Sequence, residues 1–360
     1  HINNTEDRPA LHTALRAPPE QQPPVARPVV APTLERLASL AAEIREGRYR
    51  GYSGRAITDV VHIGIGGSHL GPELLVEALA QVDGPRCHFL ANVDGDALYA
   101  AFARLNPETT VFIVVSKSFS TLETRTNADS ARSWFLERVP DLSAIARHFL
   151  AVTANVQAAR EFGIVESHVY PLWEWVGGRF SLWSAVGMPI VLAAGYPAFS
   201  ELLRGAREMD RHFRTAPPQS NGPLLMALLG IWNTNFLGAT NHAVLPYSQR
   251  LRLLPDYLQQ LEMESNGKSV HKDGTPVRTH TTSVLWGGEG TNGQHAFHQL
   301  LHQGTRGFSA DFVVCAVDEG AGVQALEIHH RWLLANALAQ SQAMMSGQAA
   351  DDPHPVSYTH

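Results

Sequence analysis

The sequence contains little cysteine and almost no lysine. Its 360 residues include two cysteines, Cys87 and Cys315, too few for a disulfide framework, so we expect a reducing compartment, the cytoplasm. Only three of the 28 basic residues are lysines, so each lysine is more informative than usual. With 34 acidic residues the formal net charge is −6, which argues against a protein that binds nucleic acid or a membrane surface.

Two long stretches without charge are the nearest approach to a membrane-spanning segment. Residues 180–200 and 215–249 contain no Asp, Glu, Lys or Arg. A spanning helix needs about 20 mostly apolar residues. The first stretch is interrupted by Gly187 and Pro189, and the second by several prolines and asparagines. We therefore predict buried helices and no membrane span.

The residue pattern predicts an α/β protein with parallel sheets. Residues 17–32 hold six prolines and indicate an extended connector on the surface, and residues 33–46 repeat apolar side chains at helical spacing. Apolar strands then alternate with helices, which is typical of a parallel sheet covered on both faces. The predicted strands of this part are residues 60–65, 110–115, 148–153 and 168–171, and its helices are residues 72–80 and 123–139.

A second unit of the same kind follows. Its predicted helices are residues 224–237, 257–263, 295–303 and 327–345, and its predicted strands are residues 281–286 and 311–317. We therefore divide the chain into an N-terminal segment with the proline-rich connector, two subdomains and a loose tail. The corresponding ranges are residues 1–45, 46–210, 211–346 and 347–360.

A glycine-rich turn follows the first predicted strand. Residues 64–68 read Gly-Ile-Gly-Gly-Ser, and glycines there allow the backbone to approach an anion at a helix N-terminus. The dinucleotide motif Gly-x-Gly-x-x-Gly needs glycine where His69 stands, and no acidic residue takes the ribose position, so no nucleotide cofactor is expected. On this motif alone, a tight turn without a ligand is an equally good interpretation.

A second turn carries four hydroxyls and one of the three lysines. Ser116, Lys117, Ser118, Ser120 and Thr121 follow the strongest predicted strand and precede a helix. Neutral donors, one ammonium group and a helix N-terminus within six residues suit a phosphate monoester. The alternative is an ordinary helix N-cap, but capping explains one hydroxyl and not the cluster.

Three further residues could carry chemistry. Arg179 heads a charge-free stretch, which indicates an inward side chain that pairs with a phosphate or, alternatively, forms an internal salt bridge. Glu264 lies among small polar residues after an apolar helix. His295 stands at the predicted start of a helix, where histidine tends to stay neutral, although a packed or surface side chain is the alternative among 18 histidines. No His-Glu-x-x-His pattern is present, so no metal is expected.

Taken together, these segments resemble the phosphoglucose isomerase family. The matching motifs lie, in order, at residues 4–16, 64–72, 116–124, 176–183, 259–268, 290–304 and 329–336. The resemblance implies two stacked sugar-isomerase (SIS) subdomains, each a three-layer αβα unit with a parallel sheet, in a homodimer that needs no metal or nucleotide. It also implies reversible conversion of glucose 6-phosphate to fructose 6-phosphate, in glycolysis and gluconeogenesis.

The resemblance also implies residue roles, by motif position. Glu264 corresponds to the base that transfers the proton, and Arg179 to the arginine beside the enediol. His295 corresponds to the ring-opening histidine, which reaches the site from the neighbouring subunit, and Gln260 contacts the sugar. The residues that correspond to the phosphate site are Gly67, Ser68, Ser116, Lys117, Ser118 and Thr121.

Elementary chemistry agrees with these roles. An aldose–ketose isomerisation moves a proton between adjacent carbons, so one carboxylate can take it from C2 and return it to C1. We expect Glu264 to be partly shielded from water, which raises the basicity of a carboxylate. A fixed arginine opposite the enediolate lowers the barrier by a few kcal/mol. The alternative, a non-catalytic SIS module that binds sugar phosphates, does not require Glu264, His295 and Arg179 together.

One family motif has no counterpart. The family's C-terminal segment carries a lysine at the ring oxygen, and none of the three lysines here lies in such a motif. We therefore interpret the chain as part of a longer protein with an incomplete second subdomain. We expect these 360 residues alone to have little isomerase activity.

Overall fold

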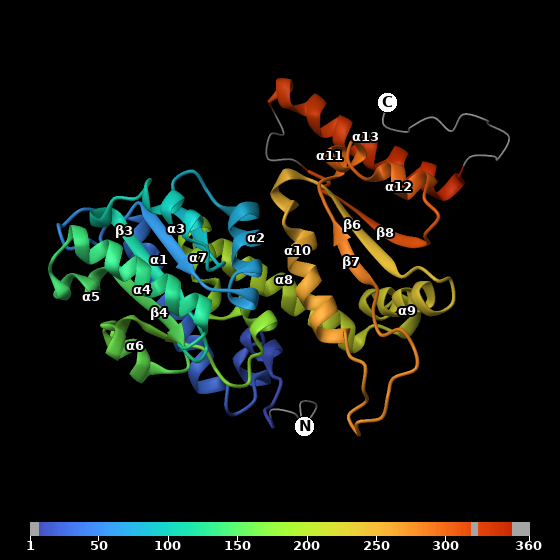
Figure 1. The fold of residues 1–360 in the computed structure, drawn as a ribbon. Helices are drawn as coiled ribbons and strands as arrows, with labels where there is room; N and C mark the ends of the chain where they lie inside the picture. The colour runs from blue at the N-terminus through green and yellow to red at the C-terminus, as the bar shows by residue number, and fades with distance from the viewer. Residues whose placement is uncertain (1–6, 318–322, 348–360) are drawn as a thin grey trace. The chain divides into compact units, whose positions relative to one another are not determined.

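The computed structural model describes residues 7–317 and 323–347 (Figure 1). The chain divides into two compact units, residues 1–215 and 216–360, each built on its own parallel sheet. The predicted α/β class with parallel sheets is therefore confirmed. The predicted tail lies outside the described residues apart from Gly347, and so does the first part of the motif at residues 4–16.

The sheet of the first unit has five parallel strands. They are β1 (Asp59–Ile63), β2 (Arg86–Leu90), β3 (Thr110–Val115), β4 (Phe149–Thr153) and β5 (Val169–Pro171), in the order β2-β1-β3-β4-β5. Every residue of β1, β3 and β4 is buried, as expected for parallel strands covered on both faces. The chain adds β2 on one side of β1 and β3 on the other, so the direction of winding reverses between β1 and β3.

Four of these five strands correspond to predicted ones. The predicted strands end within two residues of β1, β3, β4 and β5. β2 was not predicted, because Arg86, Cys87 and His88 interrupt any apolar run. It lies at the edge of the sheet, where half-exposed polar side chains are tolerated.

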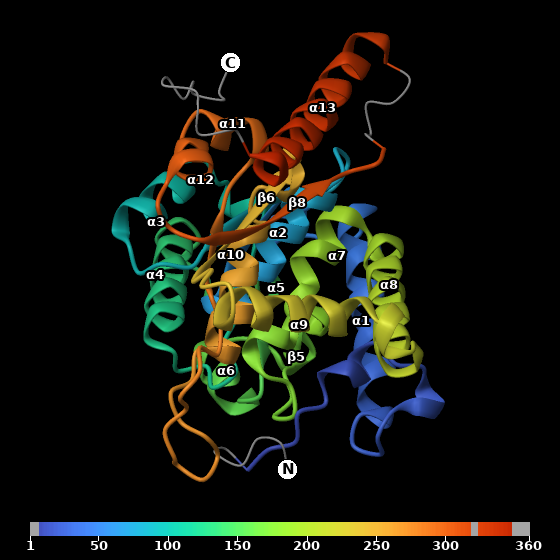
Figure 2. The ribbon, with the colours of Figure 1, turned by 90° about the vertical axis from the view of Figure 1, so that its right-hand side faces the viewer.

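Helices cover both faces of this sheet (Figure 2). On one face lie α3 (Gly95–Phe102), α4 (Leu122–Arg138), α5 (Ile145–His148) and α6 (Val156–Phe162). On the other face lie α1 (Arg27–Arg45), α2 (Leu70–Leu79) and α7 (Met188–Ala194), and α8 (Tyr196–Thr215) follows α7. All seven residues of α7 are buried, which accounts for the charge-free sequence around it.

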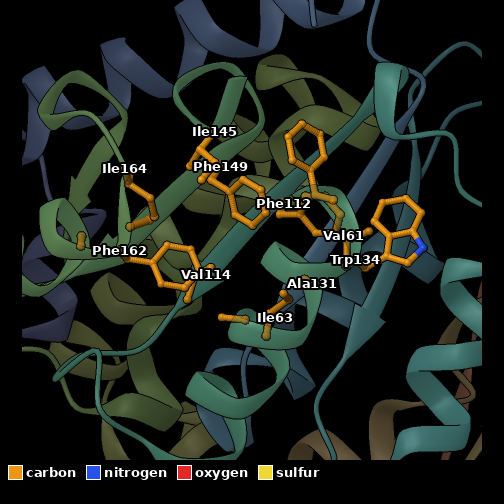
Figure 3. Close-up of a cluster of buried hydrophobic side chains, with 14 of the residues drawn as sticks. Val61, Ile63, Phe112, Val114, Ala131, Trp134, Ile145, Phe149, Phe162 and Ile164 are labelled. Atoms are coloured by element: carbon orange, nitrogen blue, oxygen red, sulfur yellow. The ribbon is translucent and has the colours of Figure 1, made fainter. Parts of the chain in front are cut away.

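A core cluster of this unit lies under α4. Phe112 of β3 and Phe149 of β4 stack with their ring centroids 4.7 Å apart. Trp134 and Phe135 of α4 pack edge-on against Phe112 (Figure 3). This cluster anchors the strands from which the predicted site residues extend.

The proline-rich connector is shorter than predicted. α1 begins at Arg27, so residues 27–32, which we expected to be extended, form its first turns. Pro28 lies in the first turn, where the backbone amide has no helical partner to lose. Pro32 removes one further hydrogen bond, and the buried side chains of Val30 and Leu37 hold the helix on the core.

The sheet of the second unit has three parallel strands. They are β6 (Asn241–Tyr247), β7 (Val284–Gly287) and β8 (Phe308–Val314), in the order β7-β6-β8. α11 (Gly290–Gln294), α12 (His298–Gln303) and α13 (Gln324–Ser346) lie beside this sheet (Figure 1). A small core joins side chains of β6, α12 and α13. α10 (Leu254–Gln259) runs along β7 and β6, and α9 (Gly222–Asn235) precedes β6.

The predictions for this unit need several corrections. The strands predicted at residues 281–286 and 311–317 lie at residues 284–287 and 308–314. β6 was missed, because Asn241, His242 and Pro246 disguise a strand that pairs on both sides. The helix predicted at residues 295–303 begins only at His298. Within the described ranges, no helix has the length and hydropathy needed to cross a bilayer.

Candidate active site

The predicted phosphate-site residues of the first unit follow two neighbouring strands. β1 and β3 pair in register, with Ile63 opposite Val114, so the segments after them leave the carboxyl edge of the sheet at the same level. We call residues 64–68 the glycine loop and residues 116–121 the hydroxyl loop. They flank the point where the direction of winding reverses, which is where open α/β sheets bind ligands.

The glycine loop fits closely against the segment that carries Arg179. A Cβ atom on Gly67 would lie 2.2 Å from the carbonyl group of Gly178 and 2.5 Å from the amide nitrogen of Arg179, so no side chain fits there. Gly66 has a φ of +59°, in the left-handed region that favours glycine. The two glycines therefore allow the turn and bring Ser68 and Arg179 onto adjacent segments.

The hydroxyl loop contains a strained residue. Phe119 has a φ of +59° although it is not glycine, and its side chain is only 3% exposed. Its ring packs edge-on against Phe162 in the core. Such backbone strain costs about 1–3 kcal/mol and tends to occur at functional sites. Burial of the Phe119 ring offsets this cost and fixes the shape of the loop.

The hydroxyls of this loop do not cap α4. Thr121 occupies the N-cap position, but its side chain accepts no hydrogen bond from the helix amides. The Ser116 and Thr121 hydroxyl oxygens lie 3.1 Å apart, and Ser118 Oγ accepts hydrogen bonds from the amide and the hydroxyl of Ser120. The N-cap interpretation is therefore wrong. Hydroxyl donors gather here at the N-terminus of a 17-residue helix, which suits an anion.

Lys117 extends toward the segment that precedes Arg179. Its Nζ donates hydrogen bonds to the carbonyls of Glu174 (3.1 Å) and Val176 (3.3 Å) and lies 3.3 Å from the Glu174 carboxylate. Arg8 pairs with the same carboxylate. We had expected the Lys117 ammonium to be available to a phosphate. In this structure it connects the hydroxyl loop to residues 174–176 instead.

Arg179 lies on the 3₁₀ helix Gly178–Trp183, which the N-terminal segment supports. Its guanidinium lies over the ring of Phe180, 5.1 Å from the centroid. His12 stacks on Phe180 with the centroids 4.5 Å apart, and burial and the nearby Arg16 lower the pKa of His12. The first unit thus brings together the glycine loop, the hydroxyl loop and the segment that carries Arg179.

Gln260 and Glu264 share one turn of the second unit. The five residues Gln260–Glu264 continue α10 as a π-helical turn, a feature frequent at functional sites. Gln260 Nε2 donates a hydrogen bond to Glu264 Oε2 at 2.8 Å, and Lys268 Nζ donates to the Glu264 carbonyl. We expected a partly shielded carboxylate, but Glu264 is exposed, because the turn lies along the edge strand β7.

His295 follows a helix instead of beginning one. α11 ends at Gln294, and His295 takes the position after its last turn. The expected location at a helix N-terminus is therefore wrong. The helix α11 begins five residues before His295, at Gly290, where a Cβ would overlap the ring of Tyr247. The His295 side chain is exposed.

Glu264 and His295 lie at opposite ends of the sheet of their unit. Thr282, just before β7, donates a hydrogen bond to Glu262 on the π-helical turn. Gln294, next to His295, donates to the hydroxyl of Tyr247 at the carboxyl end of β6. The strand between these ends spans roughly 20 Å. The second unit of one chain therefore does not bring the two residues together.

No metal centre is evident in the described ranges, 7–317 and 323–347. No group of three or more His, Cys, Asp or Glu side chains there is arranged to hold a metal ion. The histidines of α12 bind an amide instead: His298 Nδ1 and His302 Nε2 lie 3.2 Å and 2.7 Å from Gln340 Oε1.

Sequence reasoning missed two residues of the first unit. Glu174 pairs with Lys117, and its only signal was an acidic residue between two tryptophans. His62 is the fourth of the five residues of β1 and contacts the glycine loop, with Nε2 2.6 Å from the Ser68 carbonyl oxygen. Its position in an apolar strand made it look like a packing residue.

Comparison with known proteins matches nearly the whole chain to one family. The family model for phosphoglucose isomerase matches residues 1–357. The glucose-6-phosphate isomerase of Pseudomonas putida (strain GB-1) is 53% identical over 357 residues, which is 98% of this chain and 64% of the relative. That of Pseudomonas fluorescens (strain Pf0-1) is 53% identical over 353 residues, 96% of this chain and 63% of the relative.

Solved structures agree. A glucose-6-phosphate isomerase from Chlamydia trachomatis D/UW-3/Cx matches with a TM-score of 0.83 and 35% identity, covering 97% of this chain and 67% of that one. A hypothetical protein from Thermus thermophilus matches with a TM-score of 0.73 and 27% identity, covering 95% and 78%. The chain spans about 64% of the length of the curated relatives it matches. Because the family model covers nearly all of its residues, the chain belongs to the phosphoglucose isomerase family.

Proposed function

We propose that this chain is part of a cytoplasmic glucose-6-phosphate isomerase, which interconverts glucose 6-phosphate and fructose 6-phosphate in glycolysis and gluconeogenesis. Membership of the family supports the reaction. One structural observation carries the proposal. The hydroxyl loop, whose side chains are not used in capping, lies beside the glycine loop where the direction of winding reverses.

The first unit binds the phosphate group of the substrate. Ser116, Ser118 and Thr121 supply hydroxyl donors at the N-terminus of α4, and Gly67 and Ser68 supply the facing loop. Lys117 contributes its backbone and keeps residues 174–176 in place through its side chain. Since the phosphate does not take part in the reaction, these contacts orient the substrate and provide binding energy.

The second unit supplies the base. The Glu264 carboxylate takes the proton from C2 of the open-chain sugar and returns it to C1, while a proton moves from the C2 hydroxyl to the carbonyl oxygen at C1. The hydrogen bond from Gln260 holds the carboxylate beside the sugar that Gln260 contacts. The Arg179 guanidinium stabilises the negative charge of the enediolate, which lowers the barrier by a few kcal/mol.

His295 opens the sugar ring by giving a proton to the ring oxygen as its bond to C1 breaks, while the C1 hydroxyl loses its proton to water and becomes the carbonyl. We propose that His295 comes from the second subunit of a homodimer. Its separation from Glu264 within one chain supports this arrangement, since the two side chains lie at opposite ends of one sheet. A non-catalytic sugar-phosphate-binding module is the less favoured candidate, because such a module has no use for Glu264, His295 and Arg179 together.

The test is a pair of variants in the full-length protein. Glu264→Gln should lower kcat for fructose 6-phosphate formation by at least about 100-fold, as for loss of a general base, and leave the Kd of the sugar phosphate nearly unchanged. Glu262→Gln, on the same turn, is the matched control, because an amide oxygen can still accept the hydrogen bond from Thr282. Near-normal turnover in Glu264→Gln would refute the assignment of the base.

A further inference from the structure

His62 lies beneath the glycine loop. Its side chain, on β1, is 0% exposed, and its Nε2 is 2.6 Å from the carbonyl oxygen of Ser68. A carbonyl oxygen only accepts hydrogen bonds, so Nε2 must carry the hydrogen. His62 therefore donates a short, fully buried hydrogen bond to a residue of the proposed phosphate site.

This hydrogen bond defines the state of the ring. Burial lowers the pKa of His62 to about 4, so the imidazole is neutral at pH 7, with its one hydrogen on Nε2. Nδ1 is buried and finds no hydrogen-bond partner in the described part of the chain. The ring of Phe89 lies 5.3 Å away, centroid to centroid, in the neighbouring strand.

If His62 served only to fill space in the core, its ring would lower the stability of the protein. A buried nitrogen without a partner destabilises a protein by about 1–3 kcal/mol. The neighbours of His62 along β1 are Val61 and Ile63, and an aliphatic side chain would fill the same place without that cost. The contact with Ser68 is the feature that an aliphatic residue could not supply.

Ser68 is a sensitive point of the glycine loop. It ends the short 3₁₀ turn Gly66–Ser68, just before α2 begins at Leu70. Fixing its carbonyl toward the sheet fixes the orientation of its peptide and hence of its side chain. The same turn places Gly67 against the backbone of Gly178 and Arg179.

We propose that His62 is a positioning residue for phosphate binding: its Nε2–H holds the Ser68 carbonyl toward the sheet and so fixes the glycine loop in the geometry that receives the phosphate. The inference rests on the proposed function, since it takes Ser68 to be a phosphate ligand. His62 itself does not touch the substrate.

His148 offers a matched control. It is also 0% exposed, and its Nδ1 lies 2.6 Å from the carbonyl oxygen of Thr110. Thr110 begins β3, so this hydrogen bond lies at the amino edge of the same sheet, away from both loops. Leucine at position 62 removes one buried histidine hydrogen bond, and leucine at position 148 removes two, because His148 Nε2 also accepts from the Tyr52 amide at 2.9 Å. Only the first change concerns the glycine loop.

The experiment compares His62→Leu, His62→Gln and His148→Leu in the full-length protein. It measures kcat and KM for fructose 6-phosphate, the Kd of inorganic phosphate and the thermal midpoint. We expect His62→Leu to raise KM and the phosphate Kd by about tenfold, with kcat changed less than about threefold, as for one lost hydrogen bond that positions a ligand. The amide of His62→Gln can reach the same carbonyl and should restore both constants to within about threefold.

His148→Leu should lower the thermal midpoint and leave KM and the phosphate Kd unchanged. If His62→Leu changes only the thermal midpoint, as His148→Leu does, the proposal is wrong. If His62→Leu does not fold, His62→Asn replaces it, because its shorter amide stops short of Ser68, and the same two constants decide. A wild-type protein without turnover would refute the proposed function, whereas the phosphate Kd would still test His62 separately.

Discussion

Gly67 and Arg179 lie so close together that their backbones nearly touch: a Cβ on Gly67 would be 2.5 Å from the Arg179 amide nitrogen. The carbonyl group of Gly178 would be even closer, at 2.2 Å. Both neighbours are backbone atoms and cannot move aside as a flexible side chain could. The glycine loop therefore determines where the segment that carries Arg179 can lie.

A methyl group at this contact should separate the two segments. We expect Gly67→Ala in the full-length protein to destabilise it by about 1–3 kcal/mol, as overpacking does, and to lower kcat/KM for glucose 6-phosphate by at least about tenfold. Steady-state kinetics and urea unfolding measure the two effects. Gly205→Ala, in α8 with nothing within 4 Å of the added Cβ, is the control and should keep full activity. Full activity of Gly67→Ala would show that the contact does not position Arg179.

The hydroxyl loop should contribute to the binding of phosphorylated sugars and not to the binding of sugars without a phosphate group. Changing Ser118 and Thr121 together to alanine removes two donors, each worth about 1–3 kcal/mol when bonded to a charged group. Calorimetry should show weaker binding of fructose 6-phosphate and unchanged binding of a non-phosphorylated sugar acid. Ser39→Ala, an exposed hydroxyl on α1, serves as the control. An equal loss for both ligands would mean that the loop had simply lost its structure.

The sequence allowed the strands and loops at the centre of the first unit to be predicted, because β1 and β3 are rich in β-branched apolar residues and end in unusual turns. The edge strand β2 escaped prediction, since its pattern depends on which neighbours cover it. β6 escaped for a related reason: residues 241–244 pair on both sides, whereas Pro246 lies where the strand pairs with β8 alone, and a proline is tolerated there.

The chemistry of the site was predictable by residue type, but its contacts were not. The cluster of hydroxyls indicated an anion site, yet nothing in the sequence said that Lys117 would pair with Glu174, 57 residues away. His62 could not be distinguished from a core residue, because its role depends on a carbonyl six residues further along the chain. Such partners depend on how the chain folds back on itself, which local patterns do not encode.

Buried histidines should make the first unit sensitive to acid. Burial, opposed only in part by the hydrogen bond to Ser68, lowers the pKa of His62 to about 4 from 6.5. Between these values the unfolded chain binds more protons than the folded one, so stability is lost as the pH falls. We expect His62 to contribute a slope of about 1.4 kcal/mol per pH unit in this window.

Urea unfolding of the full-length protein at several pH values between 7 and 4 measures that slope. Burial lowers the pKa of His148 as well, so part of the acid sensitivity remains in any single variant. His62→Gln should reduce the slope, because glutamine does not titrate. Asp59 should contribute only at the lower end of this window: burial alone would raise its pKa, but hydrogen bonds from His88, Arg86 and Thr58 lower it from 3.8 to about 2. An unchanged slope in His62→Gln would mean that His62 does not stay neutral in the folded protein.

The last prediction concerns α9, which is apolar around its whole circumference. Thr234 is its one buried residue, whereas Met226, Leu229 and Trp232 are 64%, 59% and 52% exposed. Phe236, just after the helix, is 68% exposed and stacks on Trp232. A helix without a polar face is not stable in water unless something covers it, and exposed apolar patches of this size mark surfaces of association.

Expressed alone, the 360-residue chain should therefore associate with itself or aggregate. Light scattering after gel filtration should show species larger than the 39.3 kDa monomer, and an apolar dye should bind with enhanced fluorescence. Changing Leu229 and Trp232 together to glutamate should reduce both signals, because two charges on α9 oppose its burial against another copy. Val82→Glu, an isolated exposed residue that follows α2, should change neither signal. A monodisperse monomer that does not bind the dye would show that α9 needs no cover, and that its apolar surface has another cause.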